Sequence, residues 1–464
     1  MEKTSRYEMM TTKPVGALVV RLAGPSLAIM MISAMYNMAD TYFVGSLGTS
    51  ATASIGIAFS LMAIIQAVGF FFGQGAGSFI ARALGAQDTE KAARMAATGF
   101  FSCFGAGLVI MIVGLVFLTP LCRLLGATET ILPYAREYLL FILIGAPFMS
   151  SSLTQNNLLR FQGNSLYGMI GMITGAVLNV GLDPFFIFVL DLGIAGASLA
   201  TMLSQMVSCG LLFFVSSRQK GNIAIRFANF SPGWPAYREI SRGGLPSLLR
   251  QSVASVSVIF LNHAAGNFGD AAIAAISIVN RVVMFAFAAL LGFGQGFQPV
   301  CGFNFGARLY GRVKKAFWFC LKVSASGLVV FSVLGFIFAP QIIALFRRDD
   351  LEVIRIGTLA LRVYCFSFPL LSWIVLNNMM TQVMGKAVFA SILALARPGL
   401  LIPVVFILER SLGLFGLQIA MPLTDFCTFL LAVPVGMTVL RSMKEEPEPS
   451  ADGSLAEAGK DSAG

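Results

Sequence analysis

The sequence predicts an all-α polytopic membrane protein, with twelve transmembrane helices in two pseudo-symmetric six-helix lobes. Three observations support this fold class: the composition, the lengths of the apolar segments and an internal repeat. Hydrophobic residues make up 57% of the 464 residues and charged residues only 12%, and the mean hydropathy is +0.81. Soluble chains carry about 25% charged residues. A soluble enzyme, a disordered scaffold and a secreted disulfide-rich module are therefore disfavoured.

Twelve apolar segments are each long enough to cross a bilayer as a tilted helix. Helices are expected because a lipid-exposed backbone must satisfy its polar groups within the segment, and an α-helix does so. We predict spans over residues 15–40, 53–81, 94–118, 134–158, 165–190, 193–217, 241–264, 271–299, 315–339, 355–380, 387–408 and 412–440.

The distribution of basic residues predicts the orientation of the chain. If both termini lie in the cytoplasm, the segments on that side hold 20 of the 32 Lys and Arg residues, and the opposite loops hold 6. Lys and Arg accumulate in cytoplasmic loops. The sequence therefore predicts a multi-pass protein of the inner (plasma) membrane with both termini cytoplasmic. The net charge of +10 marks that side and does not indicate a nucleic-acid partner.

Polar stretches divide the chain. The longest internal one, RQKGNIAIRFANFSPGWPAYREISRGG, contains Pro, Gly and five basic residues. The last residues have the composition of a disordered tail. We predict a cytoplasmic N-terminus (1–14), an N-lobe (15–217), a cytoplasmic linker (218–240), a C-lobe (241–440) and a disordered tail (441–464).

The first half of the chain aligns with the second when Arg21 is paired with Arg242. In this register roughly a quarter of the positions between Arg21 and Ala86 are identical to their partners, without a gap, several times what composition alone would give. The shared residues include Pro25 and Pro246, and a Gly-Gln-Gly motif at 73–75 and 294–296. Each repeat covers six spans, so the halves are parallel and enclose a central cleft, as in alternating-access transporters.

Acidic residues inside the predicted spans are candidates for function, because ionisable groups are costly in a bilayer. Asp40, Asp183 and Asp425 lie well inside spans. A carboxyl group in a low dielectric can be protonated in one conformation and ionised in another, which is the minimum requirement for coupling transport to protons. For Asp425 a structural or gating role is also open.

The surroundings of two of these acids strengthen the case. Asn179 lies four residues before Asp183, on the same helix face, and Pro184 disfavours ideal helix at Asp183. The repeat partner of Asp40 is Leu261, and that of Asp183 falls near residues 403–404. The acidic chemistry is therefore assigned to the first half.

Other polar residues in the spans have more open roles. Pro25 is either a static kink or a hinge in the first span. Tyr36 lies one turn before Asp40, and Gln155, Asn157 and Thr201 also lie within or at the ends of spans. In the second half, Arg250 and Arg397 pair with carbonyl groups, line the cleft or serve packing.

Several other chemistries find no support in the sequence. There is no GxxxxGK[ST] motif for ATP, one histidine in the whole chain, and seven cysteines with no CxxC pair. We expect no cofactor, no catalytic site and no enzyme activity. An ion gradient remains as the energy source.

Taken together, these motifs resemble a known family, the multidrug and toxic compound extrusion (MATE) transporters. The stretches YNMADTYFVGSLGTSATASIG and GQGAGSFIARALGAQD are similar to the family's first two spans and the loop after them. LTQNNLLRFQGNS, LNVGLDPFFIF and GIAGASLAT resemble spans four to six, and GFGQGFQPVCGFNFGARLYGRV resembles the loop between spans eight and nine. The resemblance covers residues 15–440.

The resemblance implies a V-shaped pair of lobes that exports cationic and amphipathic drugs, with antibiotic resistance as a consequence, by H⁺ or Na⁺ antiport. It implies a cation-coupling site, or a Na⁺ site, at Asp40, Asn179, Asp183 and Thr201. Tyr36, Gln155, Asn157 and Arg397 are candidates for the substrate cleft, and Pro25 for the hinge. The expected partners are small-molecule drugs and the lipid bilayer, and the expected state is a monomer. The alternative is a lipid-linked oligosaccharide flippase of the same architecture.

Overall fold

The computed structural model describes residues 2–45, 49–218, 223–346 and 350–443, apart from the side chains of residues 2–5, 34–45, 49–53, 218, 262 and 270. Within these ranges every regular element is a helix, which confirms the all-α class. All seven cysteines are free thiols and six of them are buried. The buried ones serve as small apolar side chains.

The first half of the chain forms six long helices, which match the first six predicted spans to within several residues. They are α2 (Val15–Gly45), α3 (Thr49–Gly85), α4 (Thr89–Val116), α6 (Leu132–Phe161), α7 (Ser165–Pro184) and α8 (Gly193–Arg218). Short helices accompany them: α1 (Glu2–Thr12), α5 (Leu118–Leu124) and the π-helical turn η1 (Phe185–Val189).

The second half repeats this arrangement after the short 3-10 turn η2 (Phe227–Asn229). Its long helices are α9 (Trp234–Gly266), α10 (Asp270–Gly306), α11 (Tyr310–Ile337), α13 (Leu351–Cys365) with α14 (Phe368–Val383), and α15 (Ala387–Ser442), with the short α12 (Ala339–Phe346) between α11 and α13. In the described part of the chain, ten single helices are long and apolar enough to cross a membrane.

Two breaks in helices bring the number of spans to twelve. Helices α13 and α14 meet at a bend of 55° and together form one span. Helix α15 has 56 residues, but Gly413 inside it has φ 58° and ψ −136°. A straight helix of that length would reach about 84 Å, far more than a bilayer is thick. Glycine tolerates this positive φ, and the chain reverses there to give two spans.

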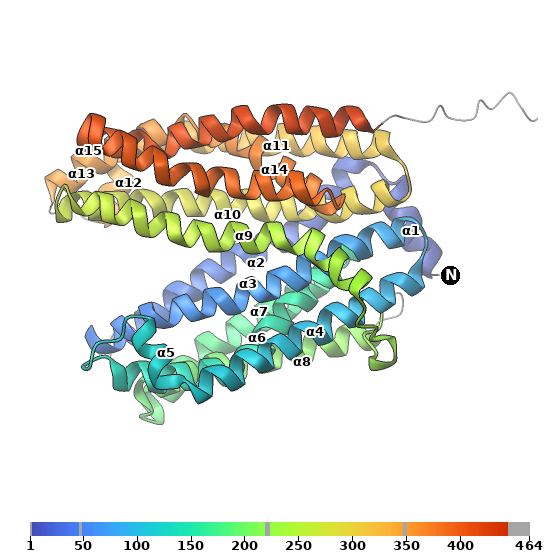
Figure 1. Ribbon diagram of the computed structural model, residues 1–464, viewed down its shortest axis with the longest axis horizontal. Coiled ribbons are helices and arrows are strands. Elements are labelled where there is room, and N and C mark those ends of the chain that lie inside the picture. Colours follow the sequence, from blue (N-terminus) through green and yellow to red (C-terminus); the bar gives the residue numbers. More distant parts are fainter. Residues whose placement is uncertain (1, 46–48, 219–222, 347–349, 444–464) are drawn as a thin grey trace, which may run out of the picture.

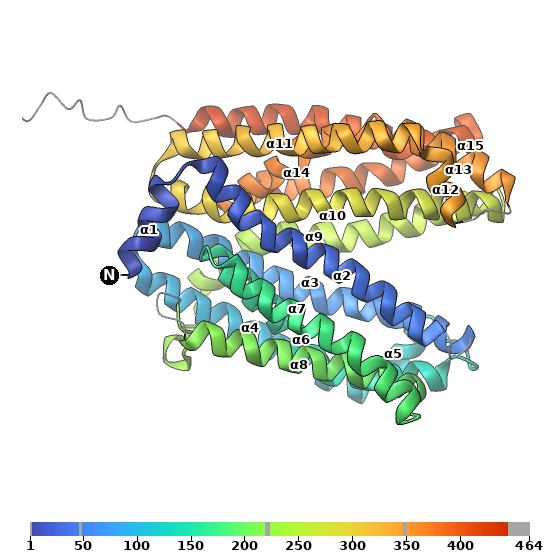
Figure 2. The same ribbon diagram turned by 180° about the vertical axis from the view of Figure 1, so that it is seen from behind.

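The two halves form separate lobes that meet at one end of the molecule (Figures 1 and 2). Helices α2 to α8 make one lobe and α9 to α15 the other. The lobes converge at the end where α1 lies and diverge toward the end that carries α5, α12 and α13. We call the converging side the closed end.

The lobes exchange the first turns of their first helices at the closed end. Leu18 and Leu22 of α2 belong to the hydrophobic core of the C-lobe. Ile240 of α9 belongs to a core cluster built from α3, α4 and α6 of the N-lobe. Helix α2 therefore packs on α10, while α9 packs on α3. This reciprocal packing is the structural counterpart of the sequence repeat.

Repeated glycines permit this close packing. A Cβ atom on Gly85 would lie 2.1 Å from the carbonyl oxygen of Phe303, and one on Gly306 would lie 2.1 Å from that of Arg82. Gly85 and Gly306 occupy equivalent positions of the internal repeat. Gly75 and Gly296 make a similar pair, against Ile240 and Ala23. Because these glycines have no side chain, the helices can approach each other closely at these positions.

Candidate functional site

A buried polar cluster lies between α7 and α8 of the N-lobe. Asp183 is 0% exposed, and Asn179 and Thr201 are also buried. The amide nitrogen of Asn179 donates to Asp183 Oδ1 over 3.3 Å and to Thr201 Oγ1 over 3.2 Å. The structure therefore brings together three of the four residues that the sequence predicted for the cation-coupling site.

The local backbone explains why this cluster forms where α7 ends. Pro184 ends the regular helix, and a π-helical turn at Phe185–Val189 follows it. Single π-helical turns are rare and often occur at functional sites. Gly196 of α8 packs against this turn, because a Cβ there would lie 2.8 Å from the carbonyl group of Phe186. Helix α8 thus approaches closely enough to place Thr201 beside Asn179.

The amide oxygen of Asn179 is the open position of this cluster. Within the described residues it is buried without a hydrogen-bond partner. Together with the Asp183 carboxylate and the Thr201 hydroxyl, it gives a set of oxygen donors of the kind that hard cations prefer. Asp40 and Tyr36 belong to the predicted site as well, but their side chains lie outside the described part of the structure. Their helix, α2, packs beside α7.

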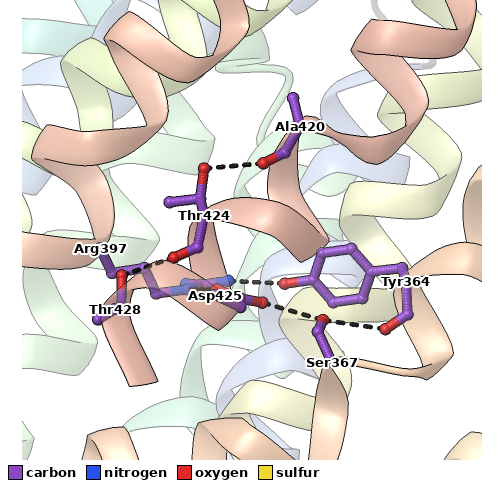
Figure 3. Close-up of polar contacts among 7 residues, drawn as sticks. All are labelled: Tyr364, Ser367, Arg397, Ala420, Thr424, Asp425 and Thr428. Carbon is purple, nitrogen blue, oxygen red and sulfur yellow. Dashed lines mark hydrogen bonds and ion pairs between the residues drawn. The ribbon is translucent and has the colours of Figure 1, made fainter. Parts of the chain in front are cut away.

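A second buried cluster lies in the C-lobe, around Asp425 (Figure 3). Arg397 Nε donates to Asp425 Oδ1 over 2.6 Å, and its Nη2 donates to the hydroxyl of Tyr364 over 2.7 Å. Ser367 Oγ donates to Asp425 Oδ2 over 3.1 Å. Both carboxylate oxygens therefore have partners. The guanidinium also lies over the ring of Phe287, 5.3 Å from its centroid.

A cavity of about 480 Å³ opens beside this cluster. Most of its wall comes from the C-lobe, and the N-lobe contributes Met30, Phe70 and Gln74. Its charged lining residues are Arg250, Arg397 and Asp425. Its volume lies within the usual range of sites for small molecules, about 300–1,000 Å³. Neither Asp183 nor its partners line this cavity, so the two polar centres are separate.

Arg160 links the lobes at the closed end. It is 1% exposed although it is charged. Its guanidinium donates to Gln298 Oε1 over 2.7 Å, to the backbone oxygen of Gln295 over 3.1 Å and to Asn157. Gln74 joins the network by bonding both Asn157 and Gln298. These bonds connect α3 and α6 of the N-lobe with α10 of the C-lobe.

The remaining predicted site residues lie in different surroundings. Arg397 lines the cavity, whereas Asn157 belongs to the network at the closed end. Gln155 is fully buried in α6, and among the described residues neither end of its amide has a partner. Pro25 lies inside α2, which continues through it. The positions of these four residues do not test the roles predicted for them, which stay predictions.

Sequence reasoning missed two features of the site. The fourth predicted span ends at residue 158 and leaves Arg160 outside it, whereas Arg160 lies in the last turn of α6 and is buried between the lobes. The pairing of Arg397 with Asp425 was also not foreseen, although both residues had been singled out. A signal for Arg160 was available, because Asn157 lies one turn before it on the same helix face.

Two repeated six-span lobes, with charged groups held inside the spans around a cavity, define a membrane transport protein. The family model MatE matches residues 25–185 and 246–407 of this chain. The two matches begin at Pro25 and Pro246, which are equivalent positions of the internal repeat. The chain belongs to this family, that of the MATE multidrug and toxic compound extrusion transporters.

Individual relatives agree with this assignment. Multidrug export protein MepA of Staphylococcus aureus (strain MSSA476) is 29% identical over 406 residues, covering 87% of this chain and 89% of MepA. A multidrug resistance MATE transporter solved in an outward-facing conformation is 27% identical, with a TM-score of 0.88 over 94% of this chain and 98% of that one. A transporter from Pyrococcus furiosus, described as having a binding pocket of reverse polarity, is 27% identical with a TM-score of 0.88, covering 95% and 99%.

Proposed function

We propose that this protein is a secondary active exporter of amphipathic drugs, driven by the inward movement of H⁺ or Na⁺. The observation that carries the coupling is the cluster of Asp183, Asn179 and Thr201, buried inside the N-lobe. A buried carboxylate is neutralised when it binds either of these ions, so ion binding changes the electrostatic interactions inside the lobe. The family and the relatives named multidrug exporters support drugs as the substrates.

The chemistry at the cluster is an exchange of partners at the carboxyl group. When Asp183 is ionised, the amide nitrogen of Asn179 donates a hydrogen bond to it. A proton, or a Na⁺ ion held by Asp183, Asn179 Oδ1 and Thr201 Oγ1, neutralises the site. Neutralisation lowers the cost of burying the carboxyl group, so ion binding favours the conformation in which the N-lobe is most tightly packed.

Export also requires the closed end to open. The outward-facing relative and the convergence of the lobes at the end near α1 support an arrangement that is open to the outside. In that orientation, both termini lie in the cytoplasm, as the basic loops predict. A green fluorescent protein fused after residue 443 would then fluoresce, and an alkaline phosphatase fused there would be inactive.

The alternative, a lipid-linked oligosaccharide flippase, is not favoured by the site. A pyrophosphate group needs several free cationic groups around it. Arg397 is already neutralised by Asp425 at 2.6 Å, which leaves Arg250 as the cavity arginine without an anionic partner in the described part of the chain.

The test is gradient-driven transport in proteoliposomes. Purified wild-type protein and Asp183→Asn are reconstituted, and dye movement is measured with an imposed proton gradient and, separately, with an imposed sodium gradient. We expect wild type to respond to one of the two gradients and Asp183→Asn, which still inserts, to respond to neither. Normal gradient-driven movement in Asp183→Asn would refute the assignment of coupling to this residue.

A further inference from the structure

We propose that the C-lobe cavity binds amphipathic compounds that carry a carboxylate, and that Arg250 is the residue that holds this group. The proposal rests on the proposed function, because it names a class of substrate for the exporter. It assigns the anionic end of the ligand to the C-lobe, while the coupling ion is bound in the N-lobe.

The charges that line the cavity carry the argument. Arg397 and Asp425 form a pair at 2.6 Å, and the other oxygen of Asp425 accepts from Ser367. The charges of Arg397 and Asp425 therefore compensate each other. Among the described residues that line the cavity, Arg250 therefore carries the net charge. In the described ranges no carboxylate oxygen lies within 4.0 Å of its guanidinium.

Arg250 has hydrogen-bonding capacity to spare. Its Nη1 donates to Asn378 Oδ1 over 3.1 Å, whereas a guanidinium carries five N–H donors. Asn378 is itself fixed, because its amide nitrogen donates to the backbone oxygen of Ala390 over 2.7 Å. The arginine is thus held in place by a neutral partner, with donors available to a ligand in the cavity. Guanidinium donors match the two oxygens of a carboxylate.

The rest of the cavity wall suits an apolar body attached to that carboxylate. Aromatic and thioether side chains line it, contributed by both lobes: Met30, Phe70, Met284, Phe287, Met379 and Met421. Methionine side chains adapt to ligands of varied shape. The volume of about 480 Å³ accommodates a molecule of drug size.

A purely cationic ligand is disfavoured at this position. It would approach two arginines, and the single lining carboxylate among the described residues is already satisfied on both oxygens. An uncompensated charge is costly in a low dielectric. An anionic group would compensate the charge of Arg250 and be stabilised, whereas a cationic group would add a second uncompensated charge. The arginine also has no counterpart in the other half, because the repeat partner of Arg250 is Ile29. The N-lobe has the same fold with an isoleucine at this position, so the fold itself does not require an arginine there.

Three probes with the same dansyl body test the proposal: dansyl-aminohexanoate, its methyl ester and dansylcadaverine, which are anionic, neutral and cationic. Binding to the purified full-length protein in detergent is followed by fluorescence anisotropy, with protein-free detergent subtracted. We expect Arg250→Gln to weaken binding of the carboxylate about ten-fold or more and to change binding of the ester by less than about two-fold. Arg281→Gln, at an exposed position of α10 outside the cavity lining, serves as the control and leaves all three unchanged.

Two outcomes would overturn the proposal. One is equal binding of the carboxylate to wild type and Arg250→Gln. The other is an equal loss of all three probes in Arg250→Gln, which would make the arginine a purely structural residue. Because binding is measured without an ion gradient, repeating it in Asp183→Asn separates this proposal from the coupling mechanism. Retained binding with lost transport would support both, and retained transport in Asp183→Asn would contradict the coupling alone.

Discussion

Asp183 and Asp425 are the two buried carboxylates among the described residues, and they differ in what surrounds them. Asp183 receives a hydrogen bond from a neutral amide at 3.3 Å, whereas Asp425 is paired with a guanidinium at 2.6 Å. The guanidinium of Arg397 directly compensates a negative charge on Asp425. Neutralising Asp425 would release Arg397 as an unpaired charge, whereas the neutral amide of Asn179 tolerates either state of Asp183. This contrast is why we assign coupling to the N-lobe and a structural role to Asp425.

Removing one partner of the C-lobe ion pair should destabilise the protein more than removing both partners. Arg397→Gln leaves Asp425, which is 1% exposed on its side chain, as an uncompensated buried charge, at a cost of about 3–5 kcal/mol. The double variant Arg397→Gln with Asp425→Asn removes both charges and should recover most of that loss. Thermal unfolding in detergent measures both. A double variant as unstable as the sum of the single variants would contradict the pairing as the source of stability.

At the residue scale, sequence reasoning predicted the N-lobe cluster better than the C-lobe one. The spacing of Asn179 and Asp183 places them on one face of a helix, and no tertiary information is needed for that. Arg397 and Asp425 lie in different spans, and their contact depends on how the two parts of α15 pack. A single sequence contains no signal for such a pairing.

At the scale of elements, the spans were predictable and their irregularities were not. Long apolar runs fix where helices cross the membrane. The sequence predicts a break between residues 408 and 412, and the chain reverses close to it, at Gly413. The bend between α13 and α14 and the π-helical turn after Pro184 depend on packing against neighbours. Pro184 indicated an irregular backbone at the second of these positions, but it did not indicate which irregular conformation forms there.

The repeated glycines at the closed end make a direct prediction. Gly85→Ala and Gly306→Ala should each destabilise the contact between the lobes by about 1–3 kcal/mol, because the new Cβ would meet a carbonyl oxygen. Gly105→Ala and Gly327→Ala, where a Cβ would meet nothing within 4 Å, should be neutral or slightly stabilising, since alanine favours helix. Thermal midpoints in detergent provide the comparison. Equal effects in all four variants would show that the close approach is unimportant.

The proline in the first span of each lobe offers a test of the hinge. We expect Pro25→Ala to slow transport strongly while leaving substrate binding intact, because α2 carries the predicted coupling residue Asp40. Pro246→Ala at the repeated position should have the smaller effect, since the residue equivalent to Asp40 is Leu261 there. Transport rates and binding affinities are measured side by side. An equal loss of transport in both variants would mean that each proline is a general kink of its lobe.

At the scale of the whole molecule, the two lobes share one fold because the sequence is duplicated, but their charged residues differ. The scaffold repeats in one register, down to the glycine contacts at the closed end. Among the described residues the charged centres do not repeat: a polar cluster around the carboxylate of Asp183 lies in the N-lobe, and an ion pair with a further arginine lies in the C-lobe. The sequence repeat predicted the two lobes. The interlobe network around Arg160 escaped prediction, because it joins residues from both halves.

The most direct test of the account is whether substrate movement drives ion movement through Asp183. Substrate is added to one side of proteoliposomes with no imposed gradient, and proton movement is followed with a trapped pH indicator, with labelled sodium in a parallel arm. We predict a substrate-dependent ion flux in wild type and none in Asp183→Asn, although the variant still binds substrate. An equal flux in Asp183→Asn would contradict the coupling of export to this residue.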